Sequence, residues 1–386
     1  MEFRLTEQEM AFQKEVREFF QKEVTDELAE ELNQGLGLGP LGWQFIRRLG
    51  AKGWLVPTLP KEYGGIGATH LQRFLIINEL HYFFPEMMSL MAATIVAPTL
   101  MIVGNEEQKK KYVLKIARGE IEFALGYTEP NAGSDLAAID LRATAEGDYF
   151  ILNGQKTFNT ACHYAQYHWL CARTAVTVPK HRGLSLFIVP LDSPGITIRP
   201  MWVMSGERTN EVFYENVRVP KENLVGEKNR GFYHMMVALS FERMFPLGHL
   251  DRALEDLVGY VKTTKRSGKV LAGDVLVRQK IAEMATRIEV CRGLCYQVAW
   301  MLDQGKVPAS EASILKVFIT ETEQEMASAG LSIMGSYGQL EPGSQYAPLK
   351  GWFEHWYLSN ARRTITAGTN EIQRNIIAQR GLGLPR

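Results

Sequence analysis

The chain has 386 residues, of which 46% are hydrophobic and 22% are charged, and its 43 basic and 43 acidic side chains cancel. This length and composition fit a globular protein of two or three domains with a sizeable core. Because the chain has no net charge, it lacks the long-range attraction that draws proteins to nucleic acid or to anionic membranes. We therefore expect neither kind of partner.

The N-terminal sequence and the cysteines predict that the protein works in a reducing cytoplasm. The N-terminal stretch MEFRLTEQEM carries charges throughout, unlike a signal peptide, and no apolar run reaches the ~18 residues of a membrane span. The four cysteines, at positions 162, 171, 291 and 295, fit neither a disulfide framework nor a zinc site. The eight histidines lack the spacing of metal ligands, so we expect no metal.

Helical patterns dominate residues 1–120. Thr6 and Glu9 form a capping box, which predicts the start of a helix at residue 7. The nearly all-apolar stretch MMSLMAATIVAPTLMIVG, from residue 87, predicts a helix that is buried on most sides. The sequence therefore predicts an N-terminal helical domain.

Residues 121–232 have the pattern of a β domain. Short β-branched and aromatic runs, among them YFILNGQKTF and LSLFIVPLD, are separated by Gly, Pro and Asp. Gly147-Asp148 lies between two such runs and predicts the turn of a hairpin. We expect these runs to form an antiparallel sheet.

Helical spacing returns in residues 233–386. One long helix is predicted by apolar residues that recur every three or four positions, namely Val277, Ile281, Met284, Ile288, Cys291, Cys295 and Val298. Further helices are predicted at roughly 307–334, 348–366 and 370–379. A β module beside helical regions suggests a ligand at their seam.

Two polar stretches of the β region could hold a planar ligand. In GYTEPNAGSD, residues 126–135, the hydroxyls of Thr128 and Ser134 and the loop amides could bind its oxygens and nitrogens. Strand residues 158–160 (Phe-Asn-Thr) offer an aromatic face, an amide and a hydroxyl, which suit a heteroaromatic ring. The alternatives are an ordinary polar turn and an ordinary strand with one half-buried Phe.

The tail segment TITAGTNEIQRN, residues 364–375, interrupts a helical pattern. Its small residues let the backbone approach a ligand closely, and a helix resumes with Thr369 or Asn370 as its N-cap. Such an arrangement can hold a phosphate or the edge of a cofactor. Ala367 stands where a reacting group would be expected, yet its methyl side chain cannot take part in a reaction.

Four motifs, in this order along the chain, resemble the acyl-CoA dehydrogenases, a flavoprotein family. They are GYTEPNAGSD (126–135), the NGQK-x-F-N-T strand (153–160), NVRVPKENLVG (216–226) and the tail AGTNEIQRNIIAQRGLGLPR (367–386). One motif would be weak, but four with suitable spacing cover essentially the whole chain. The stretch MGSYGQLEPGSQYAPL, from residue 334, resembles a divergent bacterial branch of the family.

The resemblance implies an α+β multidomain fold. Its parts would be an N-terminal α-helical domain (1–120), a middle antiparallel, β-barrel-like domain (121–232) and a C-terminal four-helix bundle (233–386), with FAD between the last two. A FAD site shared with a neighbouring subunit implies a homo-oligomer, usually a homotetramer. The implied activity is α,β-desaturation of an acyl-CoA in fatty-acid or aromatic-acid catabolism, with an electron-transfer flavoprotein as the electron acceptor.

The resemblance also implies roles for single residues. Thr128 would contact the flavin ring edge, Phe158 would replace a tryptophan that usually covers the ring, and Thr160 would place its hydroxyl near flavin N5. The other implied cofactor-binding residues are Ser134, Asn159, Gly335, Gly338, Gly368, Thr369 and Glu371. The implied substrate-binding residues are Gly133 and Ser134, beside the pantetheine arm of CoA, with Ser240 and Arg243.

One departure from the family pattern concerns the FAD pyrophosphate. Members often carry Arg-x-x-Phe-Gly before the long bundle helix, whereas in TTKRSGK (263–269) Thr264 stands at the Arg and Ser267 at the Phe. Arg278 and Gln279, after a short insertion, could restore the charge and the adenine-side contact. A surface Arg is an equally good interpretation of Arg278.

A second departure concerns the catalytic base. In many relatives the base is a Glu directly before Gly-Thr in the tail motif, and Ala367 at that position cannot accept a proton. Isovaleryl- and long-chain-type enzymes carry the base in a Glu-Arg pair on an earlier helix, which Glu242-Arg243 matches. We therefore predict that Glu242 is the base and that Arg243 orients the helix; a structural ion pair or a solvent-facing carboxylate is the alternative.

Two other functions stay open at this point. A catalytically silent subunit of a hetero-oligomer is favoured by Ala367, Thr264 and Ser267 and opposed by Glu242. A flavoenzyme of the same fold could also act as an oxidase, a desulfinase or a decarboxylating enzyme. The acyl group is not readable from one sequence, although the divergent branch favours a non-linear one.

Overall fold

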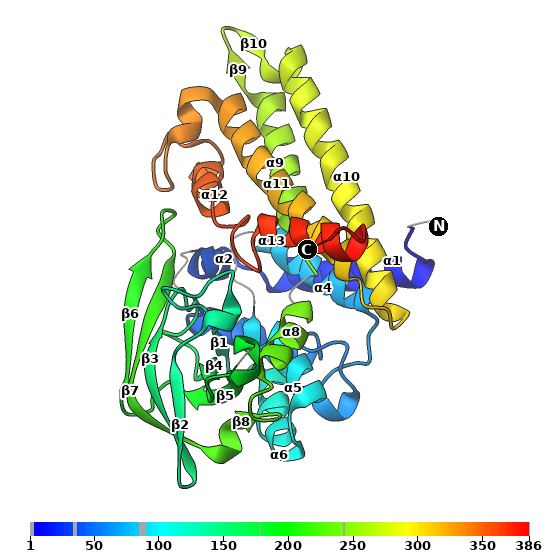
Figure 1. The fold of residues 1–386 in the computed structure, drawn as a ribbon. Coiled ribbons are helices and arrows are strands. Elements are labelled where there is room, and N and C mark those ends of the chain that lie inside the picture. The colour runs from blue at the N-terminus through cyan, green and yellow to red at the C-terminus, as the bar shows by residue number, and fades with distance from the viewer. Residues whose placement is uncertain (1–3, 34–36, 85–89, 178, 242–243, 386) are drawn as a thin grey trace. The chain divides into compact units, whose positions relative to one another are not determined.

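The computed structural model describes residues 4–33, 37–84, 90–177, 179–241 and 244–385. The chain divides into two compact units (Figure 1). The first unit comprises Met1–Asn33, Thr69–Met87 and Arg243–Arg386, and the second comprises Gln34–Ala68 and Met88–Glu242. The predicted division into three successive domains stays a prediction.

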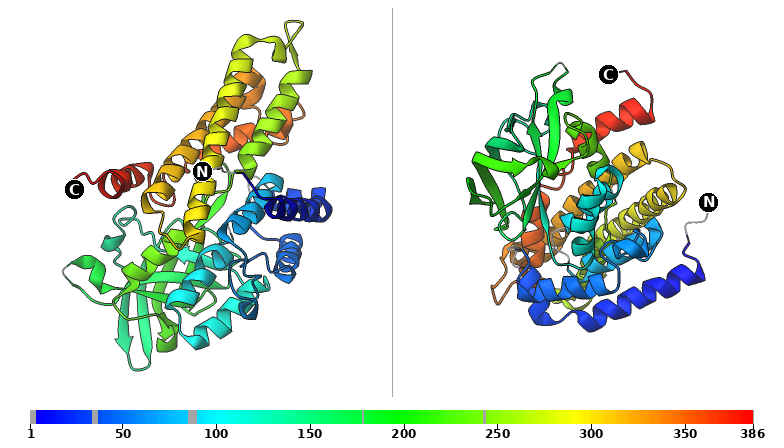
Figure 2. Two further views of the ribbon diagram at one scale, coloured as in Figure 1. Left: turned by 90° about the vertical axis from the view of Figure 1, so that its right-hand side faces the viewer. Right: turned by 90° about the horizontal axis from the view of Figure 1, so that it is seen from below.

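The first unit is mainly helical. Its helices are α1 (Glu7–Glu23), α2 (Asp26–Asn33), α4 (His70–Phe83), α9 (Gly248–Thr263), α10 (Val275–Asp303), α11 (Ala309–Met334), α12 (Trp352–Asn360) and α13 (Asn370–Ile376). A short ribbon of β9 (Lys265–Arg266) and β10 (Lys269–Val270) joins α9 to α10. Figures 1 and 2 show α9, α10 and α11 running alongside one another.

The apolar stripe of α10 lies in the core of this unit. Met284, Ile288, Cys291 and Cys295 are at most 1% exposed, and they belong to one hydrophobic cluster with buried residues of α9 and α11. All four cysteines of the chain are buried free thiols. The predicted spacing of α10 is therefore confirmed, as is the capping box of Thr6 and Glu9 at the start of α1.

The predicted helix at 348–366 is wrong at both ends, because α12 covers only Trp352–Asn360. Leu349 and Lys350 have φ angles of 50° and 58°, which are incompatible with a right-handed helix. Residues 361–369 form an irregular connection to α13, and α13 runs on into a π turn, η10 (Ile377–Gly381). The predicted helix at 307–334 is confirmed as α11.

The second unit is built around a sheet. Its strands are β1 (Phe123–Gly126), β2 (Arg142–Glu146), β3 (Tyr149–Lys156), β4 (Tyr167–Arg173), β5 (Leu184–Pro190), β6 (Ile196–Trp202), β7 (Arg208–Pro220) and β8 (Leu224–Val225). The order is β6-β7-β3-β2-β4-β5-β8, with β1 beside β4. The β2–β3 hairpin turns at Gly147 as predicted. Since β4 pairs in parallel with β1 and β2, the sheet is mixed and not purely antiparallel.

Helices of the second unit pack on this sheet or beside it. They are α3 (Pro40–Ala51), α5 (Ala97–Val103), α6 (Glu106–Gln108), α7 (Leu114–Ala117) and α8 (Gly231–Phe241). A Cβ at Gly231 would lie 2.6 Å from the Ser185 backbone, so only glycine lets α8 begin directly on β5. No helix in the described part of the chain is both long and apolar enough to cross a membrane.

The apolar stretch before α5 is buried, as its composition predicts. Its described part forms the π-helix η2 (Ala92–Val96) and then α5, and Ile95 and Leu100 are at most 1% exposed. Pro98 lies in the first turn of α5, where its missing N–H is tolerated. Residues 87–89 lie outside the described residues.

A buried carboxylate ties this segment to β1. Oε1 of Glu122 accepts hydrogen bonds from the amides of Ala92 (2.6 Å) and Phe123 (2.9 Å). Burial raises the pKa of Glu122 to about 7, although these two amides favour the charged form. A side chain with a folded-state pKa above its unfolded value stabilises the fold at low pH and loses that stability as the pH rises.

We expect Glu122→Gln to become more stable relative to the wild type as the pH rises from about 4.5 to about 7. Gln keeps the acceptor oxygen but cannot ionise, so the variant avoids a loss of up to ~3 kcal/mol. Thermal unfolding of both proteins at pH 5 and pH 8 measures the difference. The exposed neighbour Glu120, changed to Gln, serves as the control, and an equal response of both variants would contradict the assignment.

Candidate functional site

Two predicted segments of the second unit meet at one place. The amide of Thr157, just after β3, donates to the carbonyl of Thr128 in the loop after β1, over 2.9 Å. This bond places the half-buried Thr128 next to residues 158–160. The structure therefore brings together the two stretches that the sequence indicated separately.

The predicted strand over residues 158–160 is wrong, because β3 ends at Lys156 and a turn follows it. This turn presents a ring and an unpaired acceptor. Phe158 has a φ of 56° and is 60% exposed, so a strained backbone holds an aromatic residue at the surface. Asn159 is buried, and its Nδ2 donates to the carbonyls of Leu125 and Thr157, both over 3.1 Å. Its Oδ1 has no hydrogen-bond partner among the described residues. A buried acceptor of this kind is open to a donor from a bound group or an ordered water.

Strand β7 fixes the same residues from the other side. Asn210 and Asn159 exchange hydrogen bonds, the Asn159 amide to the Asn210 carbonyl at 2.9 Å and Asn210 Nδ2 to the Asn159 carbonyl at 2.8 Å. The hydroxyl of Thr160 lies 3.4 Å from that of Thr209. Sequence reasoning did not find Asn210 or Thr209, because pairing between distant strands leaves no local signal.

The predicted substrate residues of the loop after β1 are at the surface. Gly133 and Ser134 are both exposed. No described atom lies within 4 Å of a Cβ built on Gly133, so the loop leaves open space there. Ser240, at the end of α8, is exposed as well, and its hydroxyl donates to the carbonyl of Val237 over 2.6 Å.

A buried ion pair holds this loop closed. Nζ of Lys156, which is 0% exposed, contacts Oε1 of Glu129 at 2.9 Å and the Tyr127 carbonyl at 3.0 Å. The Glu129 carboxylate also accepts the amides of Asp140 (2.7 Å) and Leu141 (2.9 Å). Glu129 therefore joins the two ends of the loop that contains Gly133 and Ser134.

Lys156 lies in the part of β3 that leads to residues 158–160. Burial lowers the pKa of Lys156, although Glu129 favours its charged form. Both residues belong to motifs that the sequence singled out, yet neither was recognised. A Lys within an alternating strand, on its inward-facing side, is the signal that would have found the pair.

The tail turn lies in the first unit. Ala367 and Gly368 have φ angles of 56° and 79°. The Thr369 hydroxyl accepts the amide of Ile372 over 3.2 Å, so Thr369 is the N-cap of α13. Glu371 is exposed on the first turn of that helix. The side chain of Asn370 is buried and points into the unit, where it contacts α11.

The remaining cofactor candidates also belong to the first unit. Arg278 and Gln279 are exposed near the start of α10. Gly335 ends α11 with a φ of 65°, and Nη2 of Arg266 is 3.4 Å from a Cβ built on it. Arg266, which the sequence analysis passed over, also donates to the Ile333 carbonyl. Gly338 is buried against the last turns of α11.

The predicted base Glu242 and its neighbour Arg243 lie outside the described residues. The described helix α8 ends at Phe241, directly before this pair. Their roles stay predictions. No group of three or more His, Cys, Asp or Glu in the described part of the chain could hold a metal ion.

Comparison with known proteins decides the family. The N-terminal, middle and C-terminal domain models of acyl-CoA dehydrogenase match residues 6–120, 124–217 and 229–382. The chain belongs to the acyl-CoA dehydrogenase family. It is therefore an acyl-CoA dehydrogenase oxidoreductase with the fold that the motifs implied.

Its relatives include acyl-CoA dehydrogenase FadE26 of Mycobacterium tuberculosis, 33% identical over 100% of this chain and 99% of that protein. The crystal structure of the ChsE4-ChsE5 complex from Mycobacterium tuberculosis matches with a TM-score of 0.92 at 33% identity, over 100% of both chains. The structure described as the Tcur3481-Tcur3483 steroid ACAD matches with a TM-score of 0.91 at 32% identity, over 100% of both chains.

Acyl-CoA dehydrogenases are FAD-dependent flavoenzymes, and FAD is the cofactor of this chain. The donors and acceptors around residues 158–160 fit such a group. The unpaired Oδ1 of Asn159 could accept an N–H of a planar ring, and the exposed Phe158 could offer a face for stacking.

We expect Lys156→Met to lower the free energy of unfolding by about 3–5 kcal/mol, because Glu129 stays buried without its cation. The double variant Lys156→Met with Glu129→Gln should lose less than the sum of the two single changes. Denaturant titration measures these differences.

Glu211→Gln is the matched control, because the Glu211 carboxylate accepts Nε2 of Gln155 on the paired strand β3, over 3.1 Å, and is less buried than Glu129. Its effect should stay within about 0.5 kcal/mol. Purely additive effects of the Lys156 and Glu129 changes would contradict a coupled pair.

Proposed function

We propose that this chain catalyses the FAD-dependent α,β-desaturation of an acyl-CoA thioester in the cytoplasm, as a homotetramer. The observation that carries the proposal is the cluster of Thr128 and residues 158–160 around one unpaired buried acceptor. This cluster, in the turn that follows β3, offers a planar ring an aromatic face, a hydroxyl and an amide.

In the proposed reaction, Glu242 removes the α-proton with its carboxylate as the α C–H bond breaks. FAD, when bound, would supply the acceptor for the hydride that leaves the β-carbon, so that a C=C bond forms. A carboxylate beside an apolar acyl chain has a raised pKa, which suits a base that works near neutral pH. An electron-transfer flavoprotein is the proposed acceptor of the two electrons.

The tail turn supports the choice of Glu242. Ala367 presents a methyl group where many family members carry the base, so the carboxylate must come from another segment. The Glu242-Arg243 pair follows α8, whose sequence GFYHMMVALSF is almost entirely apolar. A Glu at the end of such a segment is costly to bury unless it has a partner or a function.

The remaining site residues keep their proposed roles. The proposed FAD contacts in the β region are Thr128, Ser134, Phe158, Asn159 and Thr160. The other proposed FAD contacts are Arg278, Gln279, Gly335, Gly338, Gly368, Thr369 and Glu371. The proposed substrate contacts are Gly133, Ser134, Ser240 and Arg243.

A hetero-oligomer is the second candidate assembly. One similar structure is a complex of two proteins, ChsE4 and ChsE5, and another is the Tcur3481-Tcur3483 steroid ACAD. Thr264 and Ser267 depart from the family motif at the FAD pyrophosphate, which a partner subunit could compensate. The steroid ACAD also supports the preference for a bulky, non-linear acyl group.

We expect Glu242→Gln to retain FAD and to lose flavin reduction by acyl-CoA, because Gln cannot accept the α-proton. Anaerobic bleaching of the flavin absorbance on addition of substrate measures this. The exposed Glu283 pairs with Lys280 on α10, and Glu283→Gln is the control that should be reduced normally. Near-normal reduction of the Glu242 variant would show that another group is the base.

We expect the chain expressed alone to be a yellow homotetramer that an acyl-CoA bleaches, with a cyclic or branched acyl group reduced faster than a straight one. Absorbance, mass in solution and a panel of acyl-CoA substrates test these points together. A colourless chain that binds FAD only with a second subunit would support the hetero-oligomer. Product analysis after anaerobic turnover separates desaturation from decarboxylation or oxidase chemistry.

A further inference from the structure

Residues 361–369 connect α12 to α13 and contain Gly368 and Thr369, two proposed FAD contacts. Ala367 and Gly368 both have left-handed backbone conformations, with φ angles of 56° and 79°. For Ala367 the Cβ makes this conformation unfavourable, so it persists only where the surroundings hold it. The question is therefore which contacts fix this connection.

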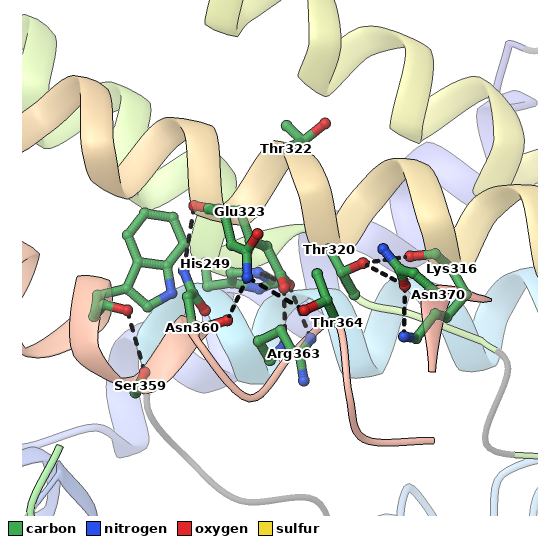
Figure 3. Close-up of polar contacts among 12 residues, drawn as sticks. His249, Lys316, Thr320, Thr322, Glu323, Ser359, Asn360, Arg363, Thr364 and Asn370 are labelled. Carbon is green, nitrogen blue, oxygen red and sulfur yellow. Dashed lines mark hydrogen bonds and ion pairs between the residues drawn. The ribbon is translucent and has the colours of Figure 1, made fainter. Parts of the chain in front are cut away.

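The first contact is a buried carboxylate on α11. The side chain of Glu323 is 1% exposed, and it accepts Nε of Arg363 at 2.7 Å, Nη2 of Arg363 at 2.8 Å and Nε2 of His249 at 2.7 Å (Figure 3). Two parallel bonds to a guanidinium fix its orientation as well as its position. Because Arg363 belongs to the connection, Glu323 holds the connection near its start.

Glu323 is ionised, as its hydrogen bonds to the Arg363 guanidinium require. Burial alone would raise the pKa of Glu323, but Arg363 and His249 outweigh burial and hold it well below its usual range. The backbone carbonyl of Glu323 also accepts Nδ2 of Asn360, over 3.2 Å. One residue of α11 thus fixes both the end of α12 and the first turn of the connection.

The second contact is two turns earlier on α11. Lys316 is 1% exposed, and its Nζ donates to Oδ1 of Asn370 over 2.7 Å. The Thr320 hydroxyl donates to the same oxygen over 3.2 Å. Figure 3 shows Glu323 and Lys316 reaching from one face of α11 to the two ends of the connection.

The third contact supports the strained turn itself. The Ser313 hydroxyl donates to Oε1 of Gln373 over 2.8 Å, which orients the amide of that side chain. Nε2 of Gln373 then donates to the carbonyls of Ala367 (3.2 Å) and Gly368 (3.3 Å). Contacts to α11 therefore fix residues 361–369 at Arg363, at the turn of Ala367 and Gly368, and at Asn370 directly after them.

We propose that Glu323 is a positioning residue for FAD binding, which acts through Arg363 to hold residues 361–369 in the shape that Gly368 and Thr369 need to meet the cofactor. The inference rests on the proposed FAD contacts of those two residues. Glu323 itself exchanges no proton or electron with substrate. It differs from an ordinary core ion pair because its partner is part of the binding segment.

The test uses the FAD-loaded protein. Glu323→Gln should release FAD about tenfold faster, because the neutral amide no longer fixes the guanidinium. The rise of flavin fluorescence after dilution measures the dissociation rate. Hydrogen–deuterium exchange of a peptide that covers residues 361–369 should accelerate in the same variant, and Glu323→Asp should recover part of both properties.

A second variant separates positioning from stability. Glu323→Gln leaves the Arg363 charge uncompensated, so it also lowers the melting temperature. In Glu323→Gln with Arg363→Met that charge is gone, and Gln still offers His249 an acceptor. We expect the double variant to regain most of the melting temperature while FAD dissociation stays about tenfold faster than in the wild type.

Glu325→Gln is the matched control. Glu325 lies on the same helix and pairs with Arg287 at 2.9 Å, away from the connection. Its change should leave FAD release and exchange at 361–369 unaltered. If the double variant regains tight FAD binding together with its melting temperature, or if exchange at 361–369 does not change, the proposal is overturned. None of these measurements needs an acyl-CoA, so failed desaturation would bear on the proposed function alone.

Discussion

A carboxylate removed from water must find donors, and this requirement shapes both candidate regions of the protein. Glu129 is satisfied by Lys156 and two loop amides, and Glu323 by Arg363 and His249. In each case the donors come from a segment other than the carboxylate's own element. The hydrogen bonds that satisfy the charge therefore also close a loop or fix a turn. An apolar contact of the same area is less directional and would fix the segment less precisely.

The two regions use this requirement in different ways. Around Glu129 the donors are largely backbone amides, so the carboxylate replaces the hydrogen bonds that a loop cannot make within itself. Around Glu323 the main donor is a guanidinium, and its fork geometry transmits orientation from a rigid helix to an irregular connection. A long helix such as α11 thus fixes the position and orientation of a connecting segment that has no regular structure of its own.

Local sequence patterns predicted most of the helices and turns, but they did not predict the side-chain contacts between distant segments. The spacing along α10, the capping box at Thr6 and the hairpin at Gly147 could all be predicted, because each signal lies within a few residues. The predicted helix at 348–366 failed because the left-handed conformations of Leu349 and Lys350 have no Gly or Asn signature. The family, its fold and FAD followed from motifs, whereas the predicted base at Glu242 lies outside the described residues.

The contacts that sequence reasoning missed share one property. Lys156 meets Glu129 across 27 positions, and Arg363 meets Glu323 across 40, so no periodicity links either pair. Ala367 illustrates the consequence. From sequence alone it marks only the absence of a carboxylate, but the structure adds a left-handed conformation that its own side chain disfavours. An inert residue held in a strained shape by Gln373 indicates that this turn contributes through its backbone geometry, whichever group removes the proton.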